Sequence, residues 1–368
     1  MKVPLLDLKG QYEQIRAEIE PAVLKQMADQ AFVLGPTVEA FEKNIAKYCQ
    51  VNHAVGMSSG TDALLCALMA YGVGPGDEVI IPTFTFFATA GVVARLGATP
   101  VFADIDPLTY NIDPDSIEDK ITDETKAIIP VHLYGQMAPM GEIMAIAKKY
   151  ELKVIEDACQ SIGASQLGQM PGEMGHCAAL SFYPSKNLAG FGDGGMLLCQ
   201  EESLAQQFRF LRMHGEDKRY YHSQVGANFR LDALQAVVLD IKLKHLSNWA
   251  EGRRKNATLY NELLADVAEI KTPHILKDNV SVYNQYVIRA ERRDELKGFL
   301  TANEIGCNIY YPVPLHIQKC FENLEGKLGD CPVSEKACEE VLALPIYPEL
   351  TEEQIRFVAA KVKEFYTK

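Results

Sequence analysis

One lysine stands in a stretch of the chain that must bend sharply. Residues 181–195 read SFYPSKNLAGFGDGG, in which Lys186 precedes a run of glycines. A phosphate-binding loop of the form G-x-x-x-x-G-K-[ST] places its glycines before the lysine, whereas here they follow it. The alternative is that Lys186 is itself a reactant, a nitrogen that forms an imine with a carbonyl group. A solvated surface lysine is the default for any single lysine, so the rest of the chain must decide.

Small and hydroxyl-bearing residues form a second candidate group. Ser58, Ser59, Gly60 and Thr61 separate the predicted strand HAVGM from the predicted helix TDALLCALMAYG. Small side chains let the backbone approach a ligand, and the free N–H groups at a helix start attract an anion such as phosphate. The same residue types serve as ordinary helix N-caps, so this stretch alone leaves both roles open.

A carboxylate completes the set. Asp157 ends the apolar strand KVIED, where a buried charge is costly unless it is paired. It is suited to pair with a protonated ring nitrogen, and equally to cap a helix or form a salt bridge. A phosphate cradle, a strand-end aspartate, and Ser181 followed by Lys186 are together the parts that hold pyridoxal phosphate (PLP). That cofactor needs a phosphate site, an acid partner for its ring nitrogen and a lysine.

The elements that must position these residues alternate between strands and helices. The predicted strands are HAVGM, EVIIP, PVFADI, KAIIPVH, KVIED, AALSFY and GMLLC, with helical patterns between most of them. This predicts an α/β fold with a mostly parallel sheet covered by helices on both faces. In such sheets ligands bind beyond the carboxyl ends of the strands, where Thr61, Asp157 and Lys186 fall. Before the sheet, an arm leads into a helix in which Pro21 predicts a kink or a break.

The pattern changes after residue 200. ESLAQQFRFLRM and the long LDALQAVVLDIKLKHLSNW are predicted helices. A smaller α+β unit follows, with VYNQYVIRA and CNIYY as strands and RRDELKGFLTAN and TEEQIRFVAAKVKEFY as helices. Residues 267–281 and 312–333 are expected to be loops. We therefore predict a large cofactor-binding domain over residues 1–245, including the arm, and a small C-terminal domain over residues 246–368.

Composition excludes several classes of protein. The 368-residue chain has a net charge of −13 and no basic stretch, which is unlike a nucleic-acid binder. A phosphate-bearing substrate must therefore be held by a local cluster of donors. Nine cysteines are scattered without a C-x-x-C motif or zinc-ligand spacing, so we expect free thiols and no metal. The absence of a signal-peptide pattern or a long apolar run predicts a cytosolic protein without a membrane span.

An ordered set of motifs carries a family resemblance. GMSSGTDALLCAL, GVGPGDEVIIPTFTFFATAG, FADIDPLTYNID, IIPVHLYGQ, VIEDACQSIGA, SFYPSKNLAGFGDGG and VGANFRLDALQA occur in this order, followed by YPVPLHIQ and LALPIYP. No single motif is decisive, but together they cover essentially the whole chain. The sequence resembles the DegT/StrS-type nucleotide-sugar aminotransferases, which are fold type I PLP enzymes with a seven-stranded sheet.

The resemblance implies a role for four residues around the cofactor ring. Lys186 matches the imine-forming lysine, and Asp157 matches the residue that pairs with the pyridine nitrogen. Gln160 matches the side chain near the ring hydroxyl. Phe86 falls where an aromatic residue stacks on the ring, although core packing alone would also account for it. The glycines at 190–195 are expected to let the backbone turn tightly and carry Lys186 back over the cofactor.

The resemblance also implies a phosphate site that two subunits share. Gly60, Thr61 and Ser181 match the phosphate donors of the family. Asn228, in GANFRLD, matches a phosphate ligand that the neighbouring subunit supplies. The active site would then be complete only in a homodimer.

The implied reaction is a two-stage transamination. An amino acid, by resemblance glutamate, gives its amino group to the cofactor, and the aminated cofactor passes it to a keto sugar on a nucleoside diphosphate. Lys186 would move the proton, which requires a pKa below the roughly 10.4 of a free lysine. Members of the family act in polysaccharide and lipopolysaccharide biosynthesis, and the same role is implied here.

The sugar and nucleotide are less determined than the reaction. HGEDKRYYHSQVGANFRLD and PTFTFFATAG most resemble enzymes that aminate UDP-2-acetamido-2-deoxy-3-oxo-hexuronates, while enzymes for dTDP-linked 3- or 4-keto-6-deoxyhexoses share most motifs. Basic and aromatic residues are the candidates to bind this substrate, although each also suits a solvated or salt-bridged position. They are Arg212, His214, Arg230, Tyr310, Tyr311 and His316.

Three rival functions remain to be weighed. Relatives that remove a sugar hydroxyl carry histidine in place of the imine lysine, and Lys186 argues against that reaction. A nicotinamide dehydrogenase needs G-x-G-x-x-G after an early strand, which SSGT does not supply. A non-catalytic PLP-binding regulatory protein need not keep both Lys186 and Asp157.

Overall fold

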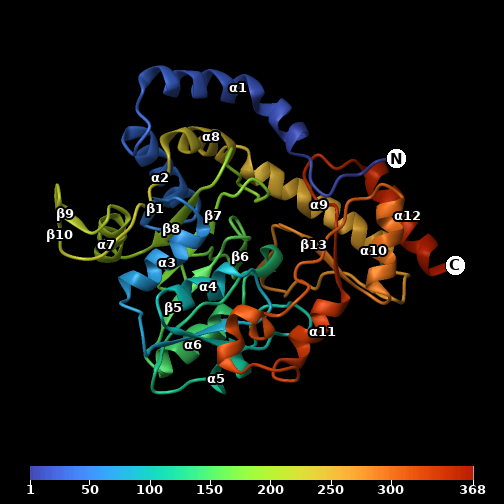
Figure 1. Ribbon diagram of the computed structural model, residues 1–368. Coiled ribbons are helices and arrows are strands. Elements are labelled where there is room, and N and C mark those ends of the chain that lie inside the picture. The colour runs from blue at the N-terminus through green and yellow to red at the C-terminus, as the bar shows by residue number, and fades with distance from the viewer. Residues whose placement is uncertain (368) are drawn as a thin grey trace.

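Seven strands form the central sheet of the protein, whose computed structural model describes residues 1–367 (Figure 1). They are β1 (His53–Met57), β2 (Glu78–Pro82), β3 (Thr99–Ala103), β4 (Thr125–Ile128), β5 (Lys153–Asp157), β7 (Cys177–Ser181) and β8 (Gly195–Cys199). Their order across the sheet is β1-β8-β7-β5-β4-β2-β3. β8 is antiparallel to β1 and β7, and the other neighbours are parallel. The predicted mostly parallel sheet is confirmed.

Helices cover both faces of this sheet because the side chains of each strand alternate between two apolar cores. In β2, Val79 and Ile81 enter one core, whereas Ile80 enters the core on the other face. The first face packs against α3 (Gly60–Ala70), α4 (Ala88–Arg95) and α7 (Glu202–Arg212). The second face packs against α2 (Pro36–Tyr48), α5 (Pro114–Glu118), α6 (Met140–Lys149) and α8 (Ala233–Leu243).

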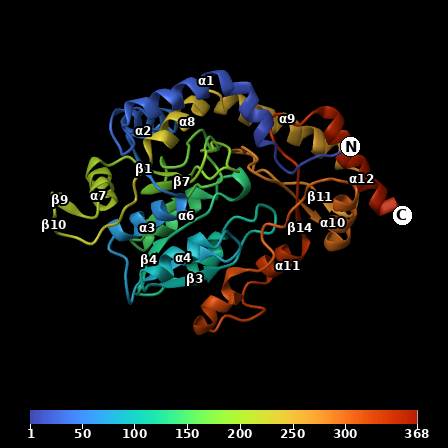
Figure 2. The ribbon, with the colours of Figure 1, turned by 45° about the horizontal axis from the view of Figure 1, so that its top comes forward.

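The first helix includes the proline at which the sequence predicts a kink or a break. α1 (Leu8–Asp29) continues through Pro21 as one helix, so a break does not occur there. Ile15 and Ile19 are buried against residues of α8 and Trp249, and this packing holds the helix together where proline removes one backbone hydrogen bond. Figures 1 and 2 both show α1 lying along α8 on the outside of the molecule.

The long helix predicted around residue 240 is two helices. α8 ends at Leu243, and α9 (Leu246–Leu264) begins three residues later. Between them, Lys244 and His245 donate their backbone N–H groups to the carbonyls of Ile241 and Lys242, which makes a tighter turn than an α-helix. The helical apolar pattern continues across this turn, and for that reason the sequence did not reveal it.

A second, smaller sheet stands beside α9. Its strands are β11 (Ile270–Lys271), β13 (Tyr286–Ala290) and β14 (Val341–Leu344), in that order. Helices α10 (Arg293–Ala302), α11 (Pro332–Glu340) and α12 (Glu352–Thr367) complete the unit. Its core includes Val3 from the other end of the chain, and both termini lie beside α12 (Figure 2). The division at residue 245 stays a prediction.

The third strand of this small sheet is not where the sequence predicted it. Residues 307–311 make only one bridge, between Asn308 and Ala343, so the strand predicted at CNIYY is wrong. The strand is β14, which follows α11 without any turn residues between the two elements. The predicted loops also contain short elements. They are β11, β12 (Asn279–Val280) paired with β6 (Ser165–Gln166), and the 3-10 turns η2 (Leu315–Ile317) and η3 (Lys319–Leu324).

Within the described residues, no helix combines the length and the apolar character that crossing a membrane would need.

Candidate active site

A cavity of about 700 Å³ opens at the carboxyl ends of the parallel strands. The residues that follow β1, β2, β5 and β7 form one side of it, and a segment of the C-terminal unit, residues 308–318, forms another. Nine of the predicted cofactor- and substrate-binding residues lie on its wall. They are Gly60, Thr61, Phe86, Asp157, Gln160, Ser181, Lys186, Tyr310 and Tyr311.

The start of α3 forms an anion cradle at the base of the cavity. Ser59 is the N-cap, and its hydroxyl accepts from the N–H of Asp62 at 3.0 Å. No acceptor for the N–H groups of Gly60 and Thr61 is found in the part of the chain that the structure describes. These groups, with the Thr61 and Ser181 hydroxyls nearby on the wall, are the donors that a phosphate needs.

Glycine is required at the first position of α3. A Cβ atom at Gly60 would lie 2.7 Å from Cys159 Sγ and 2.8 Å from Ser181 Cβ, which is closer than such atoms approach. The helix start therefore packs directly on the ends of β5 and β7. This packing brings the phosphate cradle close to Asp157, the last residue of β5.

Two hydrogen bonds fix the Asp157 carboxylate. Thr89 Oγ1 donates to Oδ2 at 2.8 Å, and the backbone N–H of Cys159 donates to Oδ1 at 3.2 Å. The side chain is only slightly exposed, yet it reaches the cavity wall. A carboxylate held in this way is suited to keep a proton on a ring nitrogen placed opposite it.

Lys186 lies in the loop between β7 and β8, with its side chain on the cavity wall. Desolvation there lowers the pKa of the amine, and this effect outweighs the electrostatic influence of Cys159 and Asp157, which raises the pKa. This is the direction that a catalytic base requires, because a neutral amine is needed to accept a proton.

Helix α8 and the 282–285 segment hold the loop that carries Lys186. Lys242 Nζ donates to the Ala189 carbonyl at 2.8 Å, and Gln235 Oε1 accepts from the N–H of Phe191 at 2.8 Å. Asn187 Nδ2 donates to the Val282 carbonyl at 3.1 Å. The lysine therefore leaves a loop whose backbone is fixed on both sides.

Aromatic and amide side chains form the upper wall. Phe86 is 56% exposed although it is a large apolar side chain, so its ring is available to a flat ligand. Its centroid lies 6.3 Å from that of Tyr311. Gln160 Nε2 donates to Tyr311 Oη at 3.0 Å, which joins the two sides of the cavity.

Two residues expected to bind the sugar nucleotide have other partners. Arg212 is buried, and its guanidinium donates to Glu42 at 2.6 Å and to the Gly56 carbonyl at 3.0 Å. His316 is also buried, and its ring nitrogens contact Thr83 Oγ1 at 2.8 Å and Glu335 Oε1 at 3.2 Å. Neither side chain lines the cavity of its own chain, and both hold backbone segments together, so their role in binding the substrate stays a prediction.

Three further candidates lie outside the cavity of their own chain. His214 and Asn228 are exposed, and Arg230 is half-buried beside Met213. They flank a hairpin of β9 (Glu216–Lys218) and β10 (Tyr221–His222), which projects from the body in Figure 1. Their predicted roles therefore require a second subunit.

Sequence reasoning missed residues that the fold brings to the site. Thr89 lies inside α4 and reads as an ordinary helix residue, yet it bonds Asp157. Gln285 and Asn308 line the cavity from the C-terminal unit. None of them belongs to a local pattern with a chemical meaning, so only the tertiary structure reveals them.

The donor set fits PLP. A helix start with free N–H groups, a fixed carboxylate, a desolvated lysine and an exposed aromatic ring meet in one cavity. Gly60 leaves no room for a side chain where the cradle forms. Fold and site together define a PLP-dependent transferase of fold type I.

The chain belongs to the DegT/DnrJ/EryC1/StrS aminotransferase family, whose model matches residues 13–363. It is a sugar aminotransferase that uses PLP. The predicted family, enzyme class and cofactor are confirmed.

Relatives cover the full length of the chain. A pleiotropic regulatory protein of Geobacillus stearothermophilus is 50% identical over 100% of this chain and 99% of its own. The UDP-N-acetyl-3-dehydro-alpha-D-glucosamine 3-aminotransferase of Acidithiobacillus ferrooxidans is 45% identical over 98% of this chain and 97% of its own. The UDP-2-acetamido-2-deoxy-3-oxo-D-glucuronate aminotransferase of Pseudomonas aeruginosa is 42% identical over 97% and 99%.

A solved structure supports the same assignment. The structure of Streptomyces venezuelae DesV in complex with a ketimine intermediate superposes with a TM-score of 0.97 at 40% identity, covering 100% of this chain and 99% of that one.

Proposed function

We propose that the protein transfers an amino group from glutamate to the 3-keto group of a UDP-linked 2-acetamido sugar. The observation that carries the proposal is the meeting of Lys186, Asp157 and the α3 cradle in one cavity. Two relatives above 40% identity have names that specify UDP-linked, 2-acetamido, 3-keto substrates, one a hexose and one a hexuronate. The hexuronate is the acceptor that the sequence motifs favour.

The residues divide the chemistry between them. When bound, PLP supplies an electron sink for the charge that develops on the donor carbon. Asp157 holds a proton at the ring nitrogen, and Thr89 keeps that carboxylate in place. The Lys186 amine accepts the proton from the donor carbon, since desolvation favours its neutral form. In the second stage the same amine gives a proton to the sugar carbon that carried the keto group.

Purified holoenzyme should complete the two half-reactions separately. We expect glutamate to bleach the yellow protein and release one equivalent of 2-oxoglutarate per site, because the first stage needs no sugar. The aminated protein should then convert a UDP-linked 3-keto 2-acetamido sugar to a product in which a hydrogen and an amino group replace the keto oxygen, measured by mass. The panel should include the hexuronate, the matching hexose and a dTDP-linked 3- and 4-keto-6-deoxyhexose.

The outcomes separate the candidates. Turnover of a dTDP sugar in preference to both UDP sugars would reject the proposed acceptor. Failure of every amino acid to bleach the protein would favour a regulatory function, which the name of the Geobacillus relative raises. A binding-only protein has no need of Lys186 and Asp157 together, which agrees with the enzyme class.

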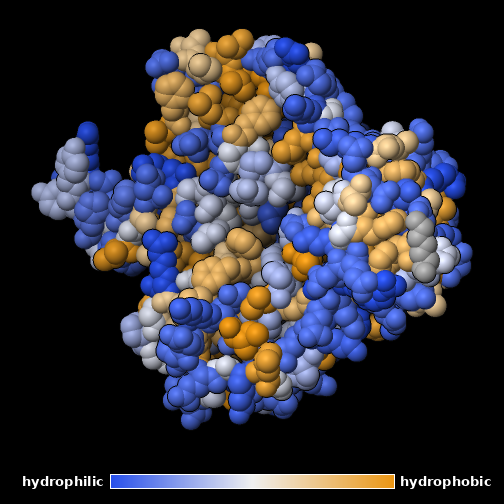
Figure 3. Space-filling view, turned by 45° about the vertical axis from the view of Figure 1, so that its right-hand side comes forward, coloured by the Kyte–Doolittle hydropathy of each residue, from blue (hydrophilic) through white to orange (hydrophobic). Residues whose placement is uncertain are grey.

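We infer further that two subunits share each active site. Asn228 is exposed, lies outside the cavity of its own chain and flanks the projecting hairpin. Figure 3 shows hydrophobic residues gathered at the top of one face, in the region of α1. On α1, Leu24 and Met27 are 64% and 49% exposed, and Val33, which follows the helix, is 64% exposed. Large exposed apolar side chains are typical of a surface that another chain covers.

Mixing two inactive variants should restore activity if the site is shared. We expect Lys186→Ala to be inactive and Asn228→Ala to lose PLP readily, since each removes one part of a complete site. After subunit exchange, mixed dimers hold one intact site and one doubly altered site, so about a quarter of wild-type activity should return. A mixture with no more activity than its components, although exchange is verified by mass, would contradict the shared site.

A further inference from the structure

Tyr134 stands behind the wall of the active site. It belongs to the 3-10 turn η1 (Leu133–Gly135), between β4 and α6, and its side chain is 8% exposed. Its φ of 58° is in the left-handed region, which is unfavourable for a bulky residue. Such a conformation persists only where the surroundings fix it, and it is found most often near functional sites.

All three polar groups of Tyr134 bond residues that line the active site. Its backbone N–H donates to Gln160 Oε1 at 2.8 Å, and its carbonyl accepts from the N–H of Gln285 at 3.5 Å. Its phenol OH donates to the Tyr310 carbonyl. Gln160 stands on the side of the parallel strands, whereas Tyr310 and Gln285 come from the C-terminal unit.

The network fixes the orientation of Gln160. An amide oxygen accepts and an amide nitrogen donates, so the Tyr134 N–H and the Tyr311 hydroxyl together define which way the amide lies. Gln160 Nε2 reaches Tyr311 at 3.0 Å. Tyr134 therefore connects to the 310–311 segment twice, once through its own hydroxyl and once through Gln160.

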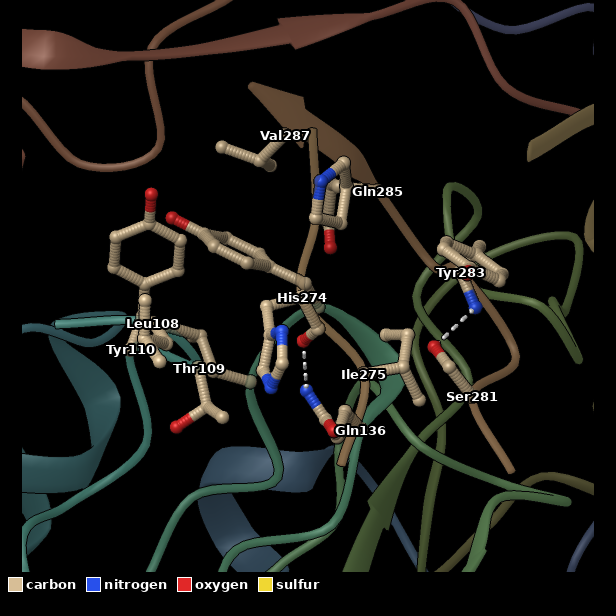
Figure 4. A pocket seen from close by; sticks show the side chains of 13 residues that line it. Leu108, Thr109, Tyr110, Gln136, His274, Ile275, Ser281, Tyr283, Gln285 and Val287 are labelled. Carbon is tan, nitrogen blue, oxygen red and sulfur yellow. Dashed lines mark hydrogen bonds between the residues drawn. The ribbon is translucent and has the colours of Figure 1, made fainter. Parts of the chain in front are cut away.

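Tight packing keeps Tyr134 in this place. Its ring meets that of Tyr110 edge-on at 6.0 Å. Behind it is a cavity of only about 20 Å³, room for roughly one water molecule, lined by Tyr110, His274 and Gln285 among others (Figure 4). Gln136 Nε2 closes one side by donating to the His274 carbonyl at 3.0 Å (Figure 4). Little free volume therefore borders the ring.

The neighbouring glycine brings the C-terminal unit close. A Cβ atom at Gly135 would lie 2.9 Å from the backbone nitrogens of Tyr283 and Asn284. The Gly135 carbonyl accepts from the N–H of Val282 at 2.9 Å. The turn that carries Tyr134 is thus docked on the segment that leads into Gln285.

We propose that Tyr134 is a positioning residue for transamination, one that holds the Tyr310 and Gln285 wall at a set distance from Gln160. The proposal deepens the proposed function and rests on it, because this wall faces the space left for the second substrate. Tyr134 is not among the residues that line the active-site cavity, so it acts through the residues that it bonds.

Tyr134→Phe tests the proposal by removing one hydroxyl. The bond to the Tyr310 carbonyl is lost, while the backbone bond to Gln160 remains. We expect the KM for the keto-sugar nucleotide to rise about two- to tenfold, the range that one hydrogen bond supports, with the glutamate half-reaction unchanged. In the cofactor-free protein, deuterium uptake over residues 308–313 should increase.

Tyr110→Phe is the matched control. It removes a phenol hydroxyl from the adjacent ring, and that hydroxyl makes no hydrogen bond to any described residue. Wild-type KM and wild-type deuterium uptake in Tyr134→Phe would overturn the proposal, as would equal changes in both variants. If the proposed acceptor itself is wrong, wild type will not turn it over, whereas the deuterium measurement still tests the role of Tyr134.

Discussion

Lys186→Ala is expected to lower kcat for transamination by about 10⁴-fold, the upper end of what a positioned acid–base group contributes. The effect is large because one amine serves both as the covalent attachment point and as the proton carrier. Desolvation lowers the pKa of this amine, so the neutral form is more available near pH 7 than in a solvated lysine. A single-turnover measurement of 2-oxoglutarate release isolates the step that Lys186 performs.

A control and a rescue separate lost chemistry from lost structure. Lys43→Ala, on the exposed face of α2, should leave the rate unchanged. Small primary amines should partly restore the rate of Lys186→Ala, since the shortened side chain leaves room for them in the cavity. Turnover by Lys186→Ala within tenfold of wild type would show that this amine is not the base.

The sequence was sufficient to predict which of these side chains meet at the carboxyl edge of the sheet. Thr61, Asp157 and Lys186 each follow a strong apolar strand, and the carboxyl ends of parallel strands meet at one edge of the sheet. The apolar strand patterns and the chemical types of these three residues therefore indicated the same edge of the sheet. The structure brings these side chains to one cavity as that rule requires.

The sequence is a weaker guide where charge alone is the clue. Arg212 and His316 were chosen as cations suited to a diphosphate, but each has a carboxylate partner, the buried Glu42 for Arg212 and the half-buried Glu335 for His316. A sequence does not show whether a cation has a partner 170 residues away, as Arg212 does. Because a buried charge needs a partner, such pairs are common in a folded core and resemble binding residues when read from the sequence.

Contacts made by the backbone were also beyond prediction. Tyr134 bonds Gln160 and Gln285 through its N–H and carbonyl, which every residue except proline possesses. The left-handed φ of Tyr134 orients these two backbone groups, and the residue type at that position does not predict such a φ. The same limit explains the strand β14, where the backbone pairs with β13 although no turn residue marks its start.

Asp157→Asn is the second large effect, expected to reduce kcat about 10²- to 10³-fold for both half-reactions. Asparagine has nearly the same shape but no charge, so it no longer holds a proton at the ring nitrogen of the cofactor. In Asp157, Thr89 Oγ1 and the Cys159 N–H each donate to a different carboxylate oxygen. The amide of asparagine has only one oxygen that accepts, and its NH₂ group donates, so one of these two donors loses its acceptor. Steady-state kcat and the affinity for PLP should be measured together, because the charge acts on both.

Thr89→Val divides the role of Asp157 into charge and orientation. Valine keeps the shape of threonine but removes the donor to Oδ2, so the carboxylate stays charged with one bond, from Cys159, in place of two. We expect kcat to fall about two- to tenfold, the scale of one hydrogen bond, which is far less than in Asp157→Asn. If both variants lost activity equally, placement of the carboxylate and not its charge would be what the reaction requires. If Asp157→Asn kept wild-type activity, the ring nitrogen would have no need of an acidic partner in this protein.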